Sequence, residues 1–176
     1  MAKSTKSNST DALDAKGAKD AKDANTLAAN ELDWPQGLLN SAGFLLNRLG
    51  RRLRERLNLA LAPLQLTTQE LGLLRIINEH GPLTQQSLGK KNLTDRTTIV
   101  HLLDTLEERQ LVVRTRNQTD RRSHLLYLTP RGKKTLSRAI KITEREQADF
   151  LQPLTGDEWQ GVRLSLVKLL LHHEQT

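Results

Sequence analysis

The most informative stretch of this chain is residues 93–132, which read LTDRTTIVHLLDTLEERQLVVRTRNQTDRRSHLLYLTPRG. Its first part has apolar residues at helical spacing and predicts a helix over 94–109 that Thr94 caps. The residues expected on the buried face of this helix are Ile99, Leu102, Leu103 and Leu106. Two short apolar runs, 111–113 and 125–128, then flank a polar segment and predict a β-hairpin.

The sequence on either side predicts further helices, separated by proline, glycine and capping residues. Those expected before the hairpin are a helix over 38–59 that ends before Pro63, a helix from Thr67 or Thr68 to Gly81, and a short helix from Thr84 to Gly89. A tight turn at 91–93 is expected to follow the short helix. Those expected after the hairpin are a helix from Thr129 and Pro130 to Leu151, a break at Pro153, and a helix from Thr155 to about His172.

A short helix, a tight turn and a capped second helix form the pattern of a helix-turn-helix motif. The second helix of such a motif fits the major groove of duplex DNA, where its first turn exposes polar side chains to base edges. The residues of this helix that we expect to contact DNA are Thr94, Asp95, Arg96, Thr97, Thr98 and His101. At the other end of the helix, Glu107, Glu108 and Arg109 are expected to face solvent.

The segment between the two predicted strands, residues 114–123, is rich in arginine. Arginine side chains suit insertion into the narrow, electronegative minor groove. The candidate DNA-contacting residues of this segment are Arg114, Arg116, Asp120, Arg121 and Arg122. The plainer interpretation of the segment is a solvated turn.

The distribution of charge favours a polyanionic partner. The formal net charge is +7, but residues 1–37 carry five lysines and six acids, so the remainder carries 22 basic and 14 acidic residues, a net +8. Residues 84–134 alone carry eleven basic and five acidic residues, a net +6. Most of the excess therefore coincides with the predicted DNA-binding stretch, as expected of a protein that neutralises phosphates.

Composition limits the class of protein. Cysteine is absent, which excludes disulfides, thiolate metal sites and cysteine redox sensing. Aromatic residues make up 3% of the chain, so the core is expected to be mostly leucine. Residues 1–30 have almost no large apolar side chain and are expected to be disordered or weakly helical. No apolar run is long enough to span a membrane and no signal-peptide core is visible, so a cytoplasmic protein is expected.

Residues 84–132 resemble the winged helix-turn-helix of the MarR family, the multiple antibiotic resistance regulators. The residues that carry the resemblance are Asp104, Leu106, Glu107, Leu111, Val112, Asp120, Arg121, Arg122, Leu128, Thr129 and Gly132. With the flanking helices, the resemblance covers about 37–173. It implies a fold that is mainly α with a small β-hairpin wing, and that has N- and C-terminal dimerisation helices.

The resemblance also implies an organisation of the chain and a mode of binding. A tail over 1–36 precedes a MarR-like domain over 37–176, in which 62–134 form the winged helix-turn-helix lobe and 37–61 and 135–176 the dimerisation helices. A homodimer of this kind places two recognition helices in successive major grooves of double-stranded DNA, about 34–36 Å apart, and favours a palindromic operator. The resemblance further implies that Arg121 or Arg122 enters the minor groove while Asp120 pairs with a neighbouring arginine.

One position departs from the family pattern. Relatives usually have glycine where this chain has Gln110, just after the recognition helix. Glycine there supplies a left-handed helix end. The glutamine is expected either to adopt that conformation at a cost of about 1 kcal/mol or to belong to a different turn.

Many relatives bind small aromatic acids, and a few residues of this chain are candidates for such an effector site. They are Trp34, Phe44, Arg48, Phe150 and Trp159. The alternative, which we prefer from sequence, is that these aromatics pack in the core or at a dimer interface. The histidines offer no metal-ligand set, and neither a catalytic pattern nor a phosphate-binding loop is visible, so no metal, no cofactor and no enzymatic activity are expected.

The sequence therefore predicts a sequence-specific DNA-binding transcription regulator. Repression is the commoner mode among relatives. Two alternatives remain open: a non-specific architectural DNA-binding protein, and a protein-interaction module that has kept the fold without DNA binding.

Overall fold

The computed structural model describes residues 34–92, 96–118, 120 and 123–174, of which 89–92 and 96 are described by their backbone alone. The chain divides into two compact units, Met1–Arg52 and Leu53–Thr176. Helix α3 (Ala42–Leu61) runs from the first unit into the second. None of the helices that the structure describes is long and apolar enough to cross a membrane.

The first unit contains a helix break that the sequence analysis did not predict. The expected helix over 38–59 is two helices, α2 (Gln36–Leu39) and α3, and the latter continues to Leu61. The hydroxyl of Ser41 accepts a hydrogen bond from the backbone N–H of Phe44 at 3.3 Å. Serine at this position satisfies a free N–H at the start of a helix, which favours a new helix start over a continuous helix.

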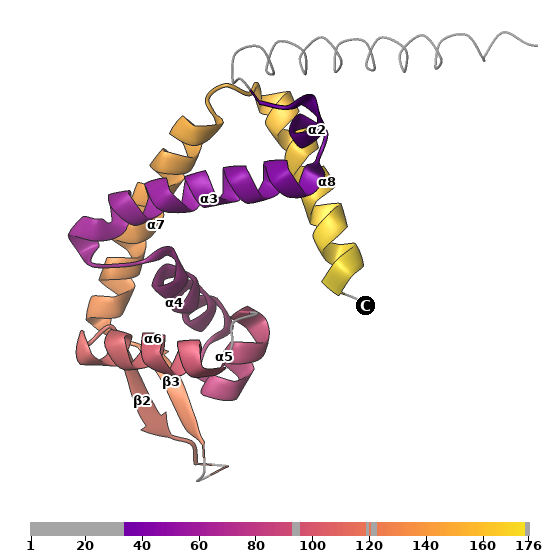
Figure 1. Ribbon diagram of the computed structural model, residues 1–176. Coiled ribbons are helices and arrows are strands. Elements are labelled where there is room, and N and C mark those ends of the chain that lie inside the picture. Colours follow the sequence, from indigo (N-terminus) through magenta and orange to yellow (C-terminus); the bar gives the residue numbers. More distant parts are fainter. Residues whose placement is uncertain (1–33, 93–95, 119, 121–122, 175–176) are drawn as a thin grey trace, which may run out of the picture. The chain divides into compact units, whose positions relative to one another are not determined.

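The second unit holds the remaining elements, which Figure 1 shows in order. They are η1 (Ala62–Leu64), α4 (Thr68–His80), β1 (Leu83–Thr84), α5 (Gln85–Asn92), α6 (Arg96–Glu108), β2 (Val112–Arg116), β3 (His124–Leu128), α7 (Pro130–Leu151) and α8 (Gly156–Glu174). The predicted fold class, mainly helical with a small hairpin, is confirmed. The short helix α5 was expected to end at Gly89, but it continues to Asn92, so the predicted turn at 91–93 is wrong at its first two positions.

The sheet has one more strand than the sequence predicted. Its order is β1-β3-β2 and both pairings are antiparallel. Strand β1 is only two residues long, and Leu83 pairs with Leu126, so the strand is defined by a partner about forty residues away. A run of two residues carries no alternating pattern, which is why β1 was missed.

Helix caps fix the starts of three long helices as predicted. Thr67 and Glu70 form a capping box at α4: the Glu70 N–H donates to Thr67 Oγ1 at 3.2 Å, and the Thr67 N–H donates to Glu70 Oε2 at 2.7 Å. Thr129 caps α7 by accepting from Gly132 N–H at 2.9 Å, with Pro130 in the first turn. Thr155 caps α8 in the same way, through Glu158 N–H at 3.3 Å.

The core of the second unit is mostly leucine, as composition required. Its buried apolar residues are Leu61, Leu66, Leu71, Leu73, Leu74, Ile77, Leu88, Ile99, Leu103, Leu106, Leu111, Val112, Leu126, Leu136 and Ala139. The helical spacing of Leu71, Leu74, Ile76 and Ile77 predicts the buried face of α4, but Ile76 is only partly buried at the edge of the core, as is Leu102. Leu73, which is fully buried, was missed because a sequence period does not fix how wide the buried face of α4 is.

Candidate nucleic-acid interface

Helix α6 presents one apolar face to the core and one polar face to solvent. Ile99, Leu103 and Leu106 are buried, at 1%, 0% and 0% exposure. Thr97 and His101, on the other face, are exposed. Because the buried face fixes the helix to the lobe, the polar face is held in a constant orientation, as a recognition helix requires.

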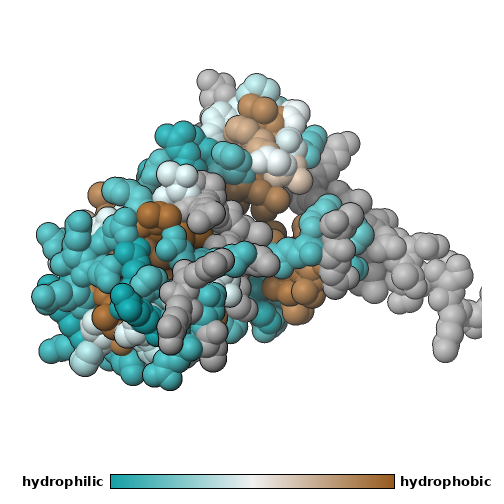
Figure 2. All heavy atoms as spheres, turned by 90° about the horizontal axis from the view of Figure 1, so that it is seen from below, coloured by the Kyte–Doolittle hydropathy of each residue, from teal (hydrophilic) through white to brown (hydrophobic). Residues whose placement is uncertain are grey.

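The predicted DNA-contacting residues are placed to different degrees. Thr97, Thr98 and His101 lie in the first two turns of α6, with Thr98 half-buried. Arg96 is the first residue of α6. Thr94, Asp95, Arg121 and Arg122 lie outside the described residues. The face of the second unit that is seen from the hairpin end is mostly hydrophilic (Figure 2).

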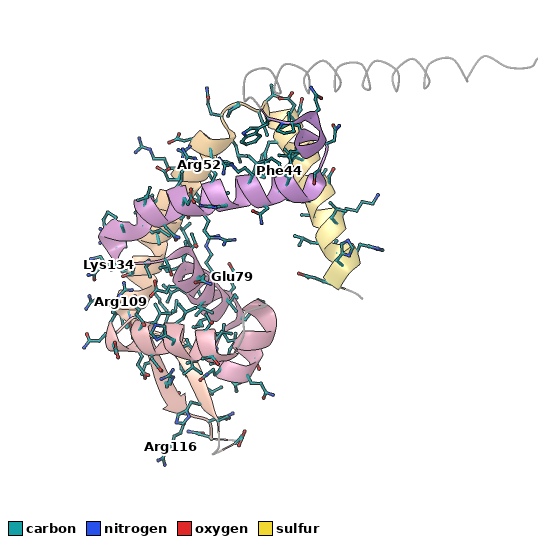
Figure 3. All side chains as sticks on the ribbon, viewed as in Figure 1. Phe44, Arg52, Glu79, Arg109, Arg116 and Lys134 are labelled. Atoms are coloured by element: carbon teal, nitrogen blue, oxygen red, sulfur yellow. The ribbon has the colours of Figure 1, made fainter. Side chains whose placement is uncertain are left out.

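The first strand of the hairpin is longer than predicted. Residues 114–116 were expected in a loop, but they belong to β2, and Arg116 pairs with His124 at the last position of the ladder. Arg116 is exposed and lies near the loop end of the hairpin (Figure 3). Five-residue strands that pair throughout project the connecting segment away from the lobe, since each strand residue adds about 3.3 Å.

Backbone and side-chain bonds close the connecting segment. Asn117 N–H donates to the Ser123 carbonyl at 3.1 Å, and Asn117 Nδ2 donates to Ser123 Oγ at 3.0 Å. Ser123 N–H in turn donates to the Asp120 carbonyl at 3.0 Å. These bonds join the ends of β2 and β3.

Arg114 connects the hairpin to the recognition helix. Its guanidinium lies 2.6 Å from Asp104 Oδ1 and 2.6 Å from Glu107 Oε2, both on α6. The Arg114 side chain is 23% exposed, so the contacts are only partly screened by water. Glu107 was expected to face solvent, and its side chain is 37% exposed, but its ion pair with Arg114 was not predicted. The two ion pairs fix β2 against α6, and therefore set the orientation of the hairpin relative to the recognition helix.

Arg109 anchors the other end of α6. Its Nη1 lies 3.3 Å from Glu70 Oε1, and its Nη2 donates to the Leu64 carbonyl at 2.8 Å. The Glu70 side chain is 6% exposed and Arg109 is 22% exposed. The prediction that Arg109 faces solvent is therefore wrong: a buried acid two helices away is not visible in the local sequence pattern. The pair joins the end of α6 to the start of α4.

The turn from α6 into β2 uses a left-handed residue, as expected of Gln110. Its φ is 57°, and the Leu111 N–H donates to the Leu106 carbonyl at 2.9 Å while the Gln110 N–H donates to the Glu107 carbonyl at 2.8 Å. This is a Schellman motif, and buried Leu106 and Leu111 supply its apolar contact. Gln110 adopts the conformation that glycine would adopt without strain.

Gly132 allows α7 to start against this turn. A Cβ built on Gly132 would lie 2.0 Å from the Leu111 carbonyl oxygen, which is closer than atoms can approach. The Thr129 N–H also donates to that oxygen, at 3.1 Å. The absence of a side chain at Gly132 thus lets α7, the hairpin and the end of α6 meet at one point.

Three of the five effector candidates contact one another, and all three belong to the first unit. In the first unit, the Trp34 and Phe44 rings meet edge to face at 5.2 Å, and the Arg48 guanidinium lies 5.4 Å from the centre of the Trp34 ring. In the second unit, the Arg56 guanidinium lies 5.9 Å from the centre of the Phe150 ring. Trp159 lies half-buried on α8. In the part of the chain that the structure describes, no group of three or more acidic or histidine side chains is arranged to hold a metal ion.

Comparison with known proteins agrees with this geometry. The model of the MarR family matches residues 66–124. The HTH-type transcriptional repressor Rv2887 of Mycobacterium tuberculosis is 30% identical over 135 residues, which are 76% of this chain and 97% of that repressor. The chain belongs to the MarR family. A relative from Thauera aromatica, whose name assigns it to transcriptional regulation of the hcr operon, is 34% identical over 103 residues, and the match spans 58% of this chain and 61% of that protein.

A solved structure of the family's fold contains DNA. The transcriptional repressor CouR bound to a 23-mer DNA duplex is 34% identical, with a TM-score of 0.69 over 76% of this chain and 94% of that chain. These relatives are transcription regulators rather than enzymes, which confirms the predicted class. This MarR-type regulator therefore has the fold in which a relative binds duplex DNA.

Proposed function

We propose that this MarR-type regulator is a repressor that binds a palindromic operator as a homodimer, with α6 in the major groove and the hairpin in the minor groove. The observation that carries the proposal is the arrangement of the two elements. The exposed polar face of α6 and the hairpin are braced to each other through Arg114. Because that brace fixes their relative orientation, the two elements can contact adjacent grooves of one duplex. Such a role requires access to the chromosome, hence the cytoplasm.

The binding residues fall into two proposed roles. Thr94, Asp95, Arg96, Thr97, Thr98 and His101 are proposed to read base edges, and Arg116, Asp120, Arg121 and Arg122 to form the wing contacts. Arg114 is proposed to position the hairpin rather than to bind DNA, since its guanidinium is already held between Asp104 and Glu107.

Footprinting of the protein across its own upstream region, at near-physiological salt with a scrambled competitor, tests sequence-specific binding. We expect a protected palindrome with half-sites about one helical turn apart. Uniform, salt-sensitive protection without a preferred site would favour an architectural protein. Absence of duplex binding even at low salt would favour a protein-interaction module. The Arg96→Ala variant is expected to weaken binding and relax specificity at one base position, so unchanged affinity and specificity would show that the proposed register of α6 is wrong.

Arg114 and Arg116 provide a matched pair on one strand. Arg116→Gln removes an exposed cation and is expected to lower the slope of log K against log salt by about 0.9, the value for one lost phosphate contact. Arg114→Gln is expected to lower affinity without that loss of slope, because it releases the hairpin from Asp104 and Glu107. A loss of slope in the Arg114 variant equal to that of the Arg116 variant would show that Arg114 also contacts phosphate.

Exposed apolar side chains support the proposed homodimer. Those of α8 are Val162, Leu164, Val167, Leu169, Leu170 and Leu171, each at least 40% exposed. An apolar surface of this kind favours association with another protein surface. Sedimentation analysis is expected to find a dimer, and Leu170→Glu to weaken it. A protein that stays monomeric at all concentrations tested would contradict this part of the proposal.

A small aromatic acid is the proposed effector. The Arg48 guanidinium lies over the Trp34 ring, and that ring contacts Phe44, so a cation and aromatic side chains stand together, which suits an aromatic carboxylate. Benzoate and phenylacetate are suitable first probes. The effector site would be supported if either acid releases the protein from the mapped operator and if the Arg48→Gln variant no longer responds to that acid. Release that is unchanged in Arg48→Gln would place the effector elsewhere.

A further inference from the structure

A basic stripe runs along one face of α7. Its five members are Arg131, Lys134, Arg138, Lys141 and Arg145, and all five are exposed. Their spacing alternates between three and four residues, so they lie on one side of the helix. The stripe spans about 21 Å, the rise of the fourteen residues that separate its two ends. Lys134 lies near the start of the helix in Figure 3.

The stripe faces away from the core of the second unit. The buried residues of α7 include Leu136, Ala139 and Thr143. At about 100° per residue, the centre of the stripe lies about 150° from the centre of that buried face. Within one chain, the packing of α7 on the lobe therefore leaves the stripe uncovered, and the exposed apolar side chains that support the proposed dimer lie on α8.

The cations of the stripe are not neutralised within the part of the chain that the structure describes. None of the five forms an ion pair or a side-chain hydrogen bond with another described residue. Residues 130–145, which contain the whole stripe, carry six basic side chains and one acid, Glu144. A helix face with this density of like charge repels itself, so it costs free energy unless a polyanion binds it.

The chemistry of the surface identifies the kind of polyanion. The exposed large apolar residues of the described chain include none from α7. Protein interfaces have a core of apolar and aromatic side chains and are depleted of charge there, unlike this face. Single-stranded nucleic acid binds through aromatic stacking, which the stripe does not offer. A surface that recognises its partner by positive charge alone fits the phosphate backbone of duplex DNA.

We propose that the α7 stripe binds the phosphate backbone of duplex DNA outside the segment that α6 and the hairpin contact. Leu128, the end of β3 that leads into α7, pairs with Val112, whereas the connecting segment lies at the other end of the ladder. Helix α7 therefore leaves the hairpin on the side away from its loop (Figure 1). DNA that flanks the contacted segment must bend toward α7 to reach the stripe, and DNA bends at a moderate cost that added contacts offset. The inference rests on the proposed function, because it assumes that the hairpin binds a duplex.

The test compares duplexes of two lengths. The variant R138Q/K141Q/R145Q neutralises the far end of the stripe. This variant and the unmodified protein are each titrated with 20-bp and 60-bp duplexes of one random sequence, over a range of salt concentrations. In parallel, the mapped upstream site is used at the same two lengths. For the 60-bp duplexes we expect the variant to lose about 2.7 from the slope of log K against log salt, about 0.9 for each of three lost contacts. For the 20-bp duplexes, which lack flanking DNA, we expect no change.

Controls separate contact from net charge and from misfolding. R138K/R145K keeps the charge and is expected to keep the slope of the unmodified protein. All substituted residues are exposed, so thermal unfolding is expected to match that of the unmodified protein. An unchanged slope on 60-bp DNA, or an equal loss on both lengths, would overturn the proposal. Equal affinity for the random and the mapped duplexes would refute the proposed sequence-specific function. The salt slopes measured on the random 60-bp duplex would still show whether the stripe binds DNA.

Discussion

The Arg109–Glu70 pair is expected to stabilise the lobe far more than a surface ion pair does. Arg109 makes two charge-assisted contacts, one with Glu70 Oε1 at 3.3 Å and one with the Leu64 carbonyl at 2.8 Å. Hydrogen bonds to charged groups each contribute about 1.5–3 kcal/mol. Since Arg109 is 22% exposed, water can replace part of this, and we take the low end of the range. Arg109→Met should therefore lower the free energy of unfolding by about 2–3 kcal/mol.

Glu70 makes the same interaction testable from the other side. Its carboxylate is 6% exposed, and it also accepts from the N–H and hydroxyl of Thr67 at 2.7 and 2.9 Å. Removing Arg109 leaves a buried charge with only these partners, which is costly. Glu70→Gln keeps the capping residue type while removing the charge, at an expected cost of about 1–2 kcal/mol. The double variant should cost less than the sum of the two single variants, by about 1 kcal/mol or more.

Urea denaturation at one fixed protein concentration measures these values, because the apparent stability of a dimer depends on concentration. Arg109→Lys is the matched control: it keeps the charge but loses the forked geometry, so we expect about half the loss. Single-variant losses below about 0.5 kcal/mol, or strict additivity in the double variant, would refute the reasoning. Either result would show that water screens the pair as it screens surface pairs.

Three other perturbations have defined outcomes. Gly132→Ala should lower the free energy of unfolding by about 1–3 kcal/mol and weaken DNA binding, because the new Cβ would lie 2.0 Å from the Leu111 carbonyl oxygen. Urea denaturation measures the first effect and DNA titration the second. A variant with unchanged stability and unchanged affinity would contradict the prediction. Gln110→Gly should raise the free energy of unfolding by about 0.5–1 kcal/mol, because glycine adopts the φ of 57° without strain. Urea denaturation that shows no gain would contradict this. Hydrogen bonds from the backbone and the side chain of Thr155 lower the pKa of Glu158. The stability that these bonds contribute is therefore present above the ordinary glutamate pKa and is lost as pH falls through the lowered pKa. An NMR titration that finds an unshifted Glu158 pKa would contradict this prediction.

The predictions that came from local chemistry were confirmed. The caps at Thr67, Thr129 and Thr155 were readable because a capping side chain and its partner lie three residues apart. Of the two outcomes that the sequence left open for Gln110, the structure shows the left-handed conformation at the end of α6. The leucine core followed from composition and helical spacing.

The errors share one physical origin. Arg109 was expected to face solvent but pairs with Glu70, and the ion pair between Glu107 and Arg114 was not predicted. Strand β1 was missed because its partner Leu126 is distant in sequence. The break before α3 was missed because one serine hydroxyl decides it. When a side chain pairs with a residue that is distant in sequence, the sequence around that side chain carries no periodic pattern that would reveal the pair.

The sequence by itself determined the helical class, the hairpin and the placement of an arginine-rich segment after a capped helix, because helical period, turn residues and caps act within a few residues. It also placed most of the basic excess in the DNA-binding stretch. Only the tertiary structure decided which arginines are held by acidic side chains of the same chain. Asp104 and Glu107 hold Arg114, and Glu70 holds Arg109, whereas Arg116 and the α7 stripe stay exposed. Ion pairing depends on distances of a few ångströms between elements, and these distances exist only once the core has packed.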